Sequence, residues 1–161
     1  MALIQAKLAG DLTRILQNPG SNAAEKAVEW ANAYFSYAAS VMAGVLVPTF
    51  LGIEQPAFLS KILPVFSNPQ GTSIQFAEAL TSAVEAFWLL PPVLFTGPGV
   101  AGAVTAFPGR LTLPLQLSGI LSRRYKEVVS PARDIAMALD VATRTVVVTF
   151  APPPGSIATL L

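Results

Sequence analysis

The first part of the chain alternates apolar and polar positions with the spacing of a helix. Apolar residues recur about every fourth position, and they are Ile4, Leu8, Leu12 and Ile15 or Leu16. Lys7, Asp11 and Arg14 fall on the opposite side. Because residues three and four apart share one face of an α-helix, the pattern predicts an amphipathic helix over about residues 2–17. The loop 18–20 then ends it.

A second helix is predicted from about Ala23 to Gly44. Asn22 can cap its first turn, and Glu25 completes a capping-box arrangement three residues later. After the charged first turns the segment is apolar on nearly every side, which is typical of a helix that is buried all round. Either a protein core or a lipid bilayer could surround it, so both environments stay open.

Two more helices precede a pair of prolines. The first is a short segment over 56–66 that Pro64 interrupts, and the loop 67–71 follows it. The second is opened by a capping-box pattern that starts at Thr72 and should run to Leu90. The two prolines after Leu90 end it, because proline disfavours helical geometry in the preceding residue.

The pattern changes to short strands and turns after these prolines. Residues 93–95 and 100–107 predict two short strands, separated by the turn 97–99. Residues 111–126 are compatible with a helix, although Pro114 weakens that prediction.

A last helix and a strand are predicted near the end of the chain. Ser130 is a good N-cap with proline at the first helical position, and the helix should end near Arg144. Residues 145–150 predict a strand, with 100–107 as its partner. We expect the tail 151–161 to be extended and to reach a neighbouring subunit.

These elements together predict one domain over 1–161. Its helical part covers about 2–90, its mixed strand and helix part about 93–150, and its extended tail 151–161. The predicted fold class is α+β and mainly α, with a bundle of four to five helices and a small antiparallel β element in the C-terminal half.

Charge is absent from two long stretches of the chain, residues 30–53 and 86–109. Charged residues make up only 12% of the chain and apolar residues 53%, against roughly 25% charged in an average soluble domain. A monomer with so few charges exposes apolar patches, which mark contacts with proteins or with lipid. The formal net charge of +1 offers no polyanion-binding surface, so we expect no nucleic-acid specificity.

The chain contains no histidine and no cysteine. Catalytic pairs and zinc sites built on these residues are therefore excluded within the chain, which leaves carboxylate pairs. Glu25 with Glu29, and Glu78 with Glu85, each fit the solvated face of a helix better than a catalytic dyad. We expect no enzymatic activity, no catalytic or metal-binding residue, no cofactor and no small-molecule substrate.

Residues 97–102 have the glycine spacing of the dinucleotide-binding fingerprint. That fingerprint also needs a following helix and an acidic residue about 20 positions later. Here Pro108 and Gly109 would cut short any such helix, and the next acidic residue, Glu127, lies beyond another proline. Turn geometry is the better interpretation of these glycines.

Two groups of charged residues are candidates for contacts. Arg123, Arg124 and Lys126 form a basic cluster, which is typical of an exposed helix end, with contact to phosphate or an acidic subunit as the alternative. Asp140 and Arg144 are spaced for an i,i+4 ion pair. If this ion pair were buried between subunits, it would determine how the subunits align more than it would stabilise the oligomer.

Six aromatic residues are the first candidates for contacts between subunits, because aromatic side chains supply the largest contact area. They are Trp30, Tyr34, Phe87, Trp88, Phe95 and Phe107. The alternative for each is that it fills the core of its own chain. Arg123, Arg124, Asp140 and Arg144 complete the set of candidate interface residues.

The two uncharged stretches differ in the environment they allow. The stretch 30–53 is long enough to span a bilayer as a helix. Residues 86–109 are broken by prolines and glycines into pieces too short to span as one helix, and their irregular backbone needs a protein environment. Burial against protein, mainly against other subunits, is therefore the first hypothesis.

Several segments of the C-terminal half carry a resemblance to a known class of proteins. They are residues 86–95, Gly102–Thr105, Pro108-Gly109, Ala138–Asp140 and Ala142–Thr149. In these segments the chain resembles small virion structural proteins of tailed bacteriophages. The resemblance implies a subunit of a head, neck, tail or baseplate that assembles in the host cytoplasm, with copies of itself and other virion proteins as partners. The alternative function is a membrane-active small protein similar to a holin or pore former.

Overall fold

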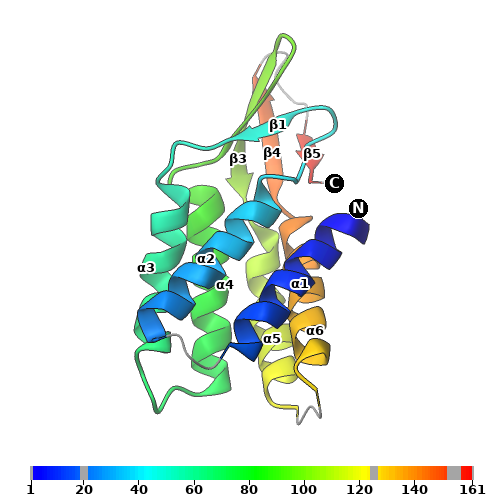
Figure 1. The fold of residues 1–161 in the computed structure, drawn as a ribbon. Coiled ribbons are helices and arrows are strands. Elements are labelled where there is room, and N and C mark those ends of the chain that lie inside the picture. The colour runs from blue at the N-terminus through cyan, green and yellow to red at the C-terminus, as the bar shows by residue number, and fades with distance from the viewer. Residues whose placement is uncertain (1, 19–21, 124–126, 152–156, 161) are drawn as a thin grey trace.

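The computed structural model describes residues 2–18, 22–123, 127–151 and 157–160. These residues form six α-helices and a five-stranded antiparallel sheet. The helices make a bundle, and the sheet stands at one end of it (Figure 1). The predicted class, α+β and mainly α with a small antiparallel sheet, is confirmed, and the bundle has six helices where four to five were expected.

The first two helices begin where the sequence predicts them. Helix α1 covers Ala2–Gln17 and helix α2 covers Ala23–Ala38. The capping box of α2 is formed, because the Glu25 backbone N–H donates to Asn22 Oδ1 at 2.9 Å. Helix α2 ends well before the predicted Gly44, which has a positive φ of 64° and lies in a tight turn. Such a turn suits glycine, which has no Cβ, and it directs the chain into the sheet.

Helix α3 covers Glu54–Phe66 and is longer than predicted, while helix α4 covers Ser73–Leu89. The prediction that Pro64 interrupts α3 is wrong. Pro64 lies in the last turn, so its missing N–H removes a single helical hydrogen bond, and the helix closes after it with Ser67 N–H donating to the Leu63 carbonyl at 3.0 Å. The Thr72 capping box of α4 is confirmed.

The five strands lie in the sheet in the order in which they occur in the chain. They are β1 Val47–Thr49, β2 Leu94–Gly97, β3 Val100–Ala106, β4 Val147–Ala151 and β5 Ile157–Thr159. The predicted turn at 97–99 joins β2 to β3 in a hairpin, with Gly99 at φ 73°. The predicted pairing of 100–107 with 145–150 is confirmed by the β3–β4 register. Strand β1 was not predicted, and β5, from the tail predicted to reach a neighbour, pairs with β4 of its own chain.

The remaining helical elements lie between β3 and β4. They are the 3₁₀-helix η1 Pro108–Leu111, helix α5 Leu113–Leu121 and helix α6 Val129–Thr143. The predicted N-cap at Ser130 is wrong, because α6 already begins at Val129 and has no side-chain cap. Pro131 fits inside the first turn, where backbone N–H groups have no helical acceptor. The predicted end near Arg144 is confirmed, and residues 124–126 lie outside the described part of the chain.

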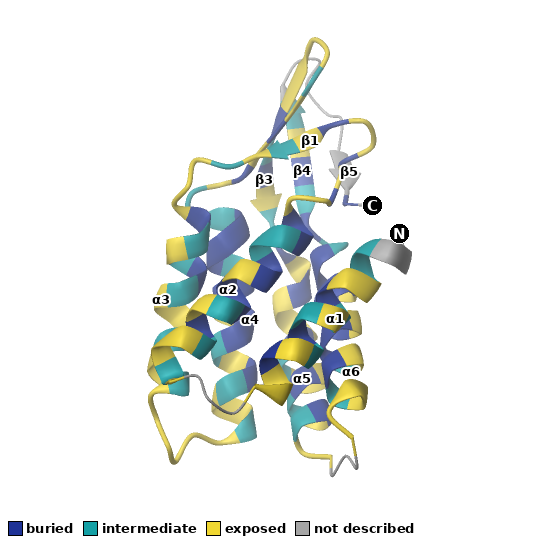
Figure 2. Cartoon of the chain, in the orientation of Figure 1, coloured by how far each residue is buried: buried dark blue, intermediate teal, exposed yellow. Residues whose placement is uncertain are grey.

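One hydrophobic cluster connects the bundle to the sheet. Figure 2 shows the buried positions on the sides of the helices that face one another. At the junction, the rings of Trp88 in α4 and Phe95 in β2 stack with centroids 6.2 Å apart. Gly102 lies under Phe150, and a Cβ there would be 2.6 Å from the Phe150 ring, so only glycine fits. Among the described residues, no helix combines the length and the apolar character needed to cross a membrane.

Candidate interaction surface

Two predicted interface residues, Tyr34 and Trp88, meet inside the bundle. The Trp88 Nε1–H group donates to the Tyr34 hydroxyl at 2.8 Å. The same hydroxyl shares a second hydrogen bond, also 2.8 Å long, with Thr143 Oγ1. Burial raises the pKa of Tyr34, because an ionised phenol would lose its hydration there. These bonds tie α2, α4 and α6 together just below the sheet.

The predicted Asp140–Arg144 pair forms beside these bonds. Arg144 Nε donates to Asp140 Oδ2 at 2.9 Å, and Tyr37 donates its hydroxyl hydrogen to Asp140 Oδ1 at 2.9 Å. The hydrogen bond that Arg144 donates to the Asp140 carboxylate raises the pKa of Arg144, and burial raises the pKa of Tyr37. Asp140 is 7% exposed and shares its carboxylate between two partners of its own chain. The Tyr37–Asp140 hydrogen bond therefore fixes α6 against α2 within one subunit, and the ion pair with Arg144 lies within the C-terminal end of α6.

The six aromatic candidates lie in the core of their own chain, each at most 6% exposed. They are Trp30, Tyr34, Phe87, Trp88, Phe95 and Phe107. Each finds its partners within the subunit; the Tyr34 ring, for example, stacks on Phe58 at 5.1 Å between centroids. Core filling is thus the role that the structure gives them, and none offers an exposed surface. Arg123 is exposed at the end of α5, and Arg124 lies outside the described residues.

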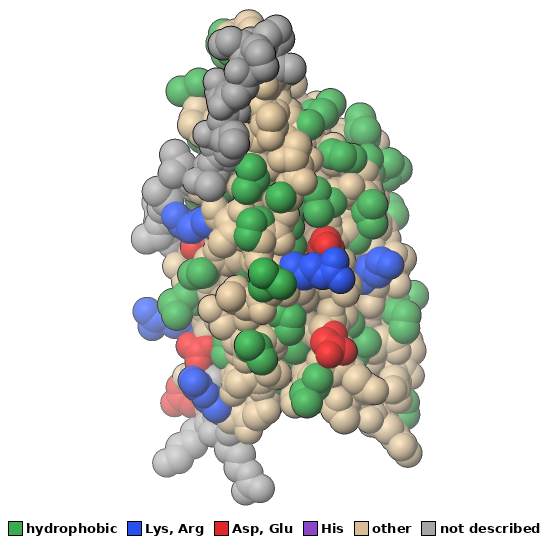
Figure 3. Space-filling view, turned by 180° about the vertical axis from the view of Figure 1, so that it is seen from behind, with side chains coloured by type: hydrophobic (Ala, Val, Ile, Leu, Met, Phe, Trp, Pro, Cys, Tyr) green, Lys and Arg blue, Asp and Glu red, His purple; other side chains and the backbone are tan. Residues whose placement is uncertain are grey.

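A different surface emerges where uncharged parts of the chain meet. The last charged residue is Arg144, so residues 145–161 form a third uncharged stretch beside 30–53 and 86–109. The fold brings parts of all three into the sheet and its adjoining loops. We refer to residues 41–53, 90–107 and 145–151 as the sheet end. In the view from behind, hydrophobic side chains (green) lie at the top of the molecule, and the charged side chains (blue and red) lie lower (Figure 3).

Large aliphatic side chains are exposed in this sheet end. They are Met42, Val45, Val47, Leu51, Ile53, Leu90, Leu94 and Val100. Val45 is 79% exposed, which makes it one of the most exposed apolar side chains of the described residues. Sequence reasoning that gave priority to aromatic residues missed this surface. The signal that could have found it is the absence of charge in three stretches that also contain strands.

The strand register assigns the side chains of the sheet to two faces, because directly paired residues point to the same side. The inner face carries Pro48, Phe95, Gly102, Val104, Val148 and Phe150. The outer face carries Val47, Thr49, Leu94, Thr96, Ala101, Ala103, Thr105 and Thr149. The inner side chains are buried or half-buried. On the outer face Ala103 is half-buried, as is the Ala106–Val147 pair beyond the bulge in β3, and the other outer side chains named here are exposed.

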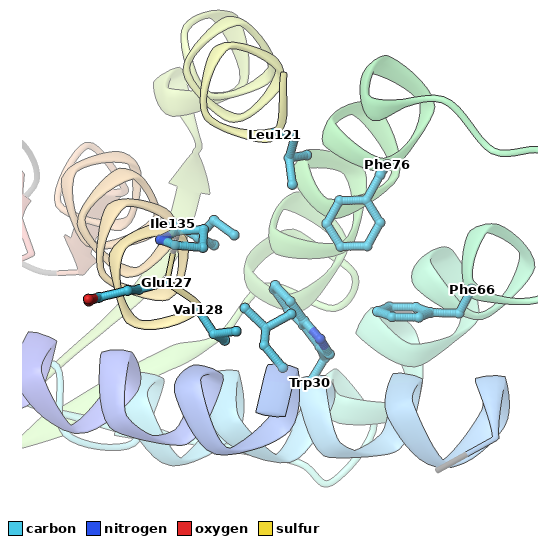
Figure 4. A pocket seen from close by; sticks show the side chains of 9 residues that line it. Trp30, Phe66, Phe76, Leu121, Glu127, Val128 and Ile135 are labelled. Atoms are coloured by element: carbon cyan, nitrogen blue, oxygen red, sulfur yellow. The ribbon is translucent and has the colours of Figure 1, made fainter. Parts of the chain in front are cut away.

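A pocket of about 450 Å³ opens at the end of the bundle opposite the sheet. Its wall consists of Leu16, Trp30, Phe66, Phe76, Leu121, Glu127, Val128, Pro131 and Ile135. Figure 4 shows the labelled side chains arranged around it, and Trp30 packs edge-to-face on Phe76 with centroids 5.5 Å apart. Among the described residues of this wall, Glu127 is the one that carries a charge. The pocket therefore offers apolar surface without the set of polar groups that positions a substrate.

In the part of the chain that the structure describes, no three acidic side chains come together in a way that could hold a metal ion. Comparisons with protein-family models, with curated proteins and with solved structures found no match.

Proposed function

We propose that this chain is a non-enzymatic structural subunit of a symmetric virion assembly, part of a phage head, neck, tail or baseplate. It acts by packing against copies of itself and against other virion proteins, without a cofactor. The observation that carries this proposal is the sheet end, in which three uncharged stretches meet and aliphatic side chains are exposed.

Burial of this surface between subunits follows from its composition. Apolar surface in water is unfavourable by roughly 25 cal/mol per Å², so a contact that covers it is stabilised. Interfaces of permanent assemblies are more hydrophobic than ordinary surface. A ring or shell repeats the same contact around a symmetry axis and covers the sheet end of every copy.

The polar groups of the core support a structural role. Tyr34, Tyr37, Asp140 and Arg144 are engaged with one another or with Trp88 and Thr143. Paired and buried groups of this kind hold helices in place, whereas a catalytic group must reach a substrate in a cleft. The proposal therefore places the function of the chain on its surface.

Fractionation and sedimentation test this function. The full chain is expressed, cell material is separated into soluble, membrane and particle fractions, and the purified chain is examined by analytical ultracentrifugation. We expect a defined oligomer or sedimentation with particles. A strict monomer that never enters the particle fraction contradicts the proposal, and a requirement for detergent supports the holin-like alternative.

Matched variants locate the contact surface. The double variant Val45→Ser with Leu51→Ser removes two exposed aliphatic side chains from the sheet end. Ile74→Ser is the control, because Ile74 is 58% exposed at the opposite end of the bundle. We expect the double variant to weaken assembly and the control to leave it unchanged. Equal effects of both would contradict assembly through the sheet end.

A further inference from the structure

The outer face of the sheet has hydroxyl groups that bond to one another. Thr49 Oγ1 lies 2.9 Å from Thr96 Oγ1, and Thr105 Oγ1 lies 2.9 Å from Thr149 Oγ1. A buried hydroxyl costs free energy mainly when it has no partner. Thr105 Oγ1 also donates to the Val147 carbonyl at 3.4 Å, so both hydroxyl hydrogens of the Thr105–Thr149 pair have acceptors within the face. In the Thr49–Thr96 pair one hydroxyl hydrogen is used, and the other needs an acceptor in the covering surface, which limits the cost of removing water to one donor.

The absence of charge limits what can cover this face. A charged partner surface would lose its hydration against the face and find no counter-charge. Two copies of the same uncharged face meet without any like-charge contact, and a two-fold axis brings identical patches together. We propose that the outer face packs against the outer face of a second copy of this chain. This inference rests on the proposed function, since it names the partner and the contact face of the sheet end.

Contact through the face is favoured over contact through the β1 edge. Strand β1 lies at one edge of the sheet and contains Pro48 at its centre. Proline has no N–H, so this edge lacks a donor for pairing with another strand. The face, in contrast, presents β-branched and small side chains, which interdigitate when two sheets stack about 10 Å apart.

The size of the face sets the expected strength of the contact. Four strands about 4.8 Å apart, with each residue rising about 3.3 Å, give it roughly 300 Å² per copy. Two copies therefore bury roughly 600 Å², below the 1,200 Å² or more of stable complexes. A single pair of faces is accordingly a weak contact, detected at high concentration and reinforced by other contacts in an assembly.

A charge placed on the face tests the contact. Ala101 is exposed on the outer face, and Ala101→Lys introduces an ammonium group that its counterpart in a second copy would repel. Sedimentation equilibrium of the full chain should show an association constant lowered by about tenfold or more, which corresponds to about 1.4 kcal/mol. Ser82→Lys, on the exposed side of α4, is the matched control and should leave it unchanged. Circular dichroism verifies that both variants are folded.

Cross-linking provides a second measurement, because the chain contains no cysteine. Ala103→Cys puts a single thiol at the centre of the outer face, and Ser82→Cys puts one on the bundle. A short bis-maleimide should link two copies of the A103C chain and leave the S82C chain monomeric.

The outcomes separate this inference from the proposed function. If the chain forms an oligomer or enters particles, but A103C is not cross-linked and A101K has no effect, the face contact is wrong while the structural role stands. A strict monomer at every concentration, absent from particles, overturns both. Binding to neutral phosphatidylcholine vesicles that A101K abolishes, without self-association, assigns the face to lipid and also overturns the inference.

Discussion

Glu85 and Arg110 pair at 2.8 Å on the surface of the bundle, whereas the sheet end carries no charged residue at all. Inside the bundle, buried polar groups such as the Tyr34 hydroxyl have hydrogen-bond partners from other helices of the same chain. At the sheet end, aliphatic side chains such as Val45 remain exposed. Exposed aliphatic side chains such as Leu115 also occur on the bundle, but there charged residues lie among them, whereas the sheet end has none. The two regions therefore differ in charge and in internal polar contacts, and the uncharged sheet end is the surface that gains most from being covered.

The largest effect that can test this difference is expected at Trp88. Trp88→Ala removes a fully buried ring, its stacking on Phe95 and its hydrogen bond to Tyr34. We expect the free energy of unfolding to fall by about 3–5 kcal/mol, measured by urea denaturation. Trp88→Phe is the matched control and should cost less, because it keeps an aromatic ring there. A loss below about 1 kcal/mol would show that the bundle does not depend on this junction.

The pH dependence of stability should come from the bundle alone. Burial raises the pKa of Tyr34 and Tyr37, so both stay neutral in the folded chain at pH values where the unfolded chain ionises. The contribution of the two tyrosines to the free energy of unfolding is complete below about pH 10. It is lost as the pH rises further, at about 1.4 kcal/mol per pH unit for each tyrosine. Urea unfolding between about pH 8 and pH 11 measures this slope.

Two further measurements serve as references for this slope: the unfolding of the Tyr37→Phe variant and the pH dependence of self-association. Tyr37→Phe should reduce it, because one of the two buried phenols no longer titrates. Self-association through the uncharged sheet end should not change with pH while the chain stays folded. A slope that Tyr37→Phe leaves intact would assign the pH dependence to other groups.

A smaller effect is expected when ion pairs of the bundle are broken. Asp140→Ala leaves the Tyr37 hydroxyl and the Arg144 guanidinium without their shared acceptor, and should cost about 2–3 kcal/mol. Glu85→Ala breaks the Arg110 pair, in which the arginine side chain is 64% exposed, and should cost less than about 1 kcal/mol. Thermal or urea unfolding compares the two. Equal losses of unfolding free energy in the two variants would mean that burial does not determine how much each ion pair contributes to stability.

The smallest effect on stability is expected at the sheet end. Val45→Ser changes a side chain that is largely exposed in the single chain, so the free energy of unfolding should change by less than about 0.5 kcal/mol. Self-association, followed by sedimentation, should nevertheless weaken. If unfolding were affected and association were not, Val45 would belong to the stability of the single chain, and the contrast between the two regions would fail.

Local patterns allowed much of the bundle to be predicted from the sequence. The capping boxes that start at Asn22 and Thr72 involve residues three positions apart, so they are visible without knowledge of the fold. The end of α2 and the strand β1 were not predictable in this way. Val47–Thr49 is three residues long and contains a proline, and it becomes a strand because β2 offers a partner far along the chain.

The aromatic residues chosen from the sequence as contact candidates do not lie on the surface. The low charge content indicated a surface for packing, yet the aromatic residues chosen for it, such as Trp88, lie in the core. Sequence indicates that a large apolar side chain needs burial, but not whether its own chain provides the cover. That depends on distant contacts, such as the stacking of Phe95 on Trp88.

The sequence by itself determined the starts of α1, α2 and α4, the fold class and the uncharged stretches, because hydrogen bonding within a few residues and the period of apolar positions are local properties. Only the tertiary structure decided that parts of three uncharged stretches meet at one end, and that the threonine hydroxyls of the outer face bond to one another. The physical reason is that the burial of a side chain depends on contacts with residues far apart in the chain. Strand register, in turn, decides which side chains share a face of the sheet.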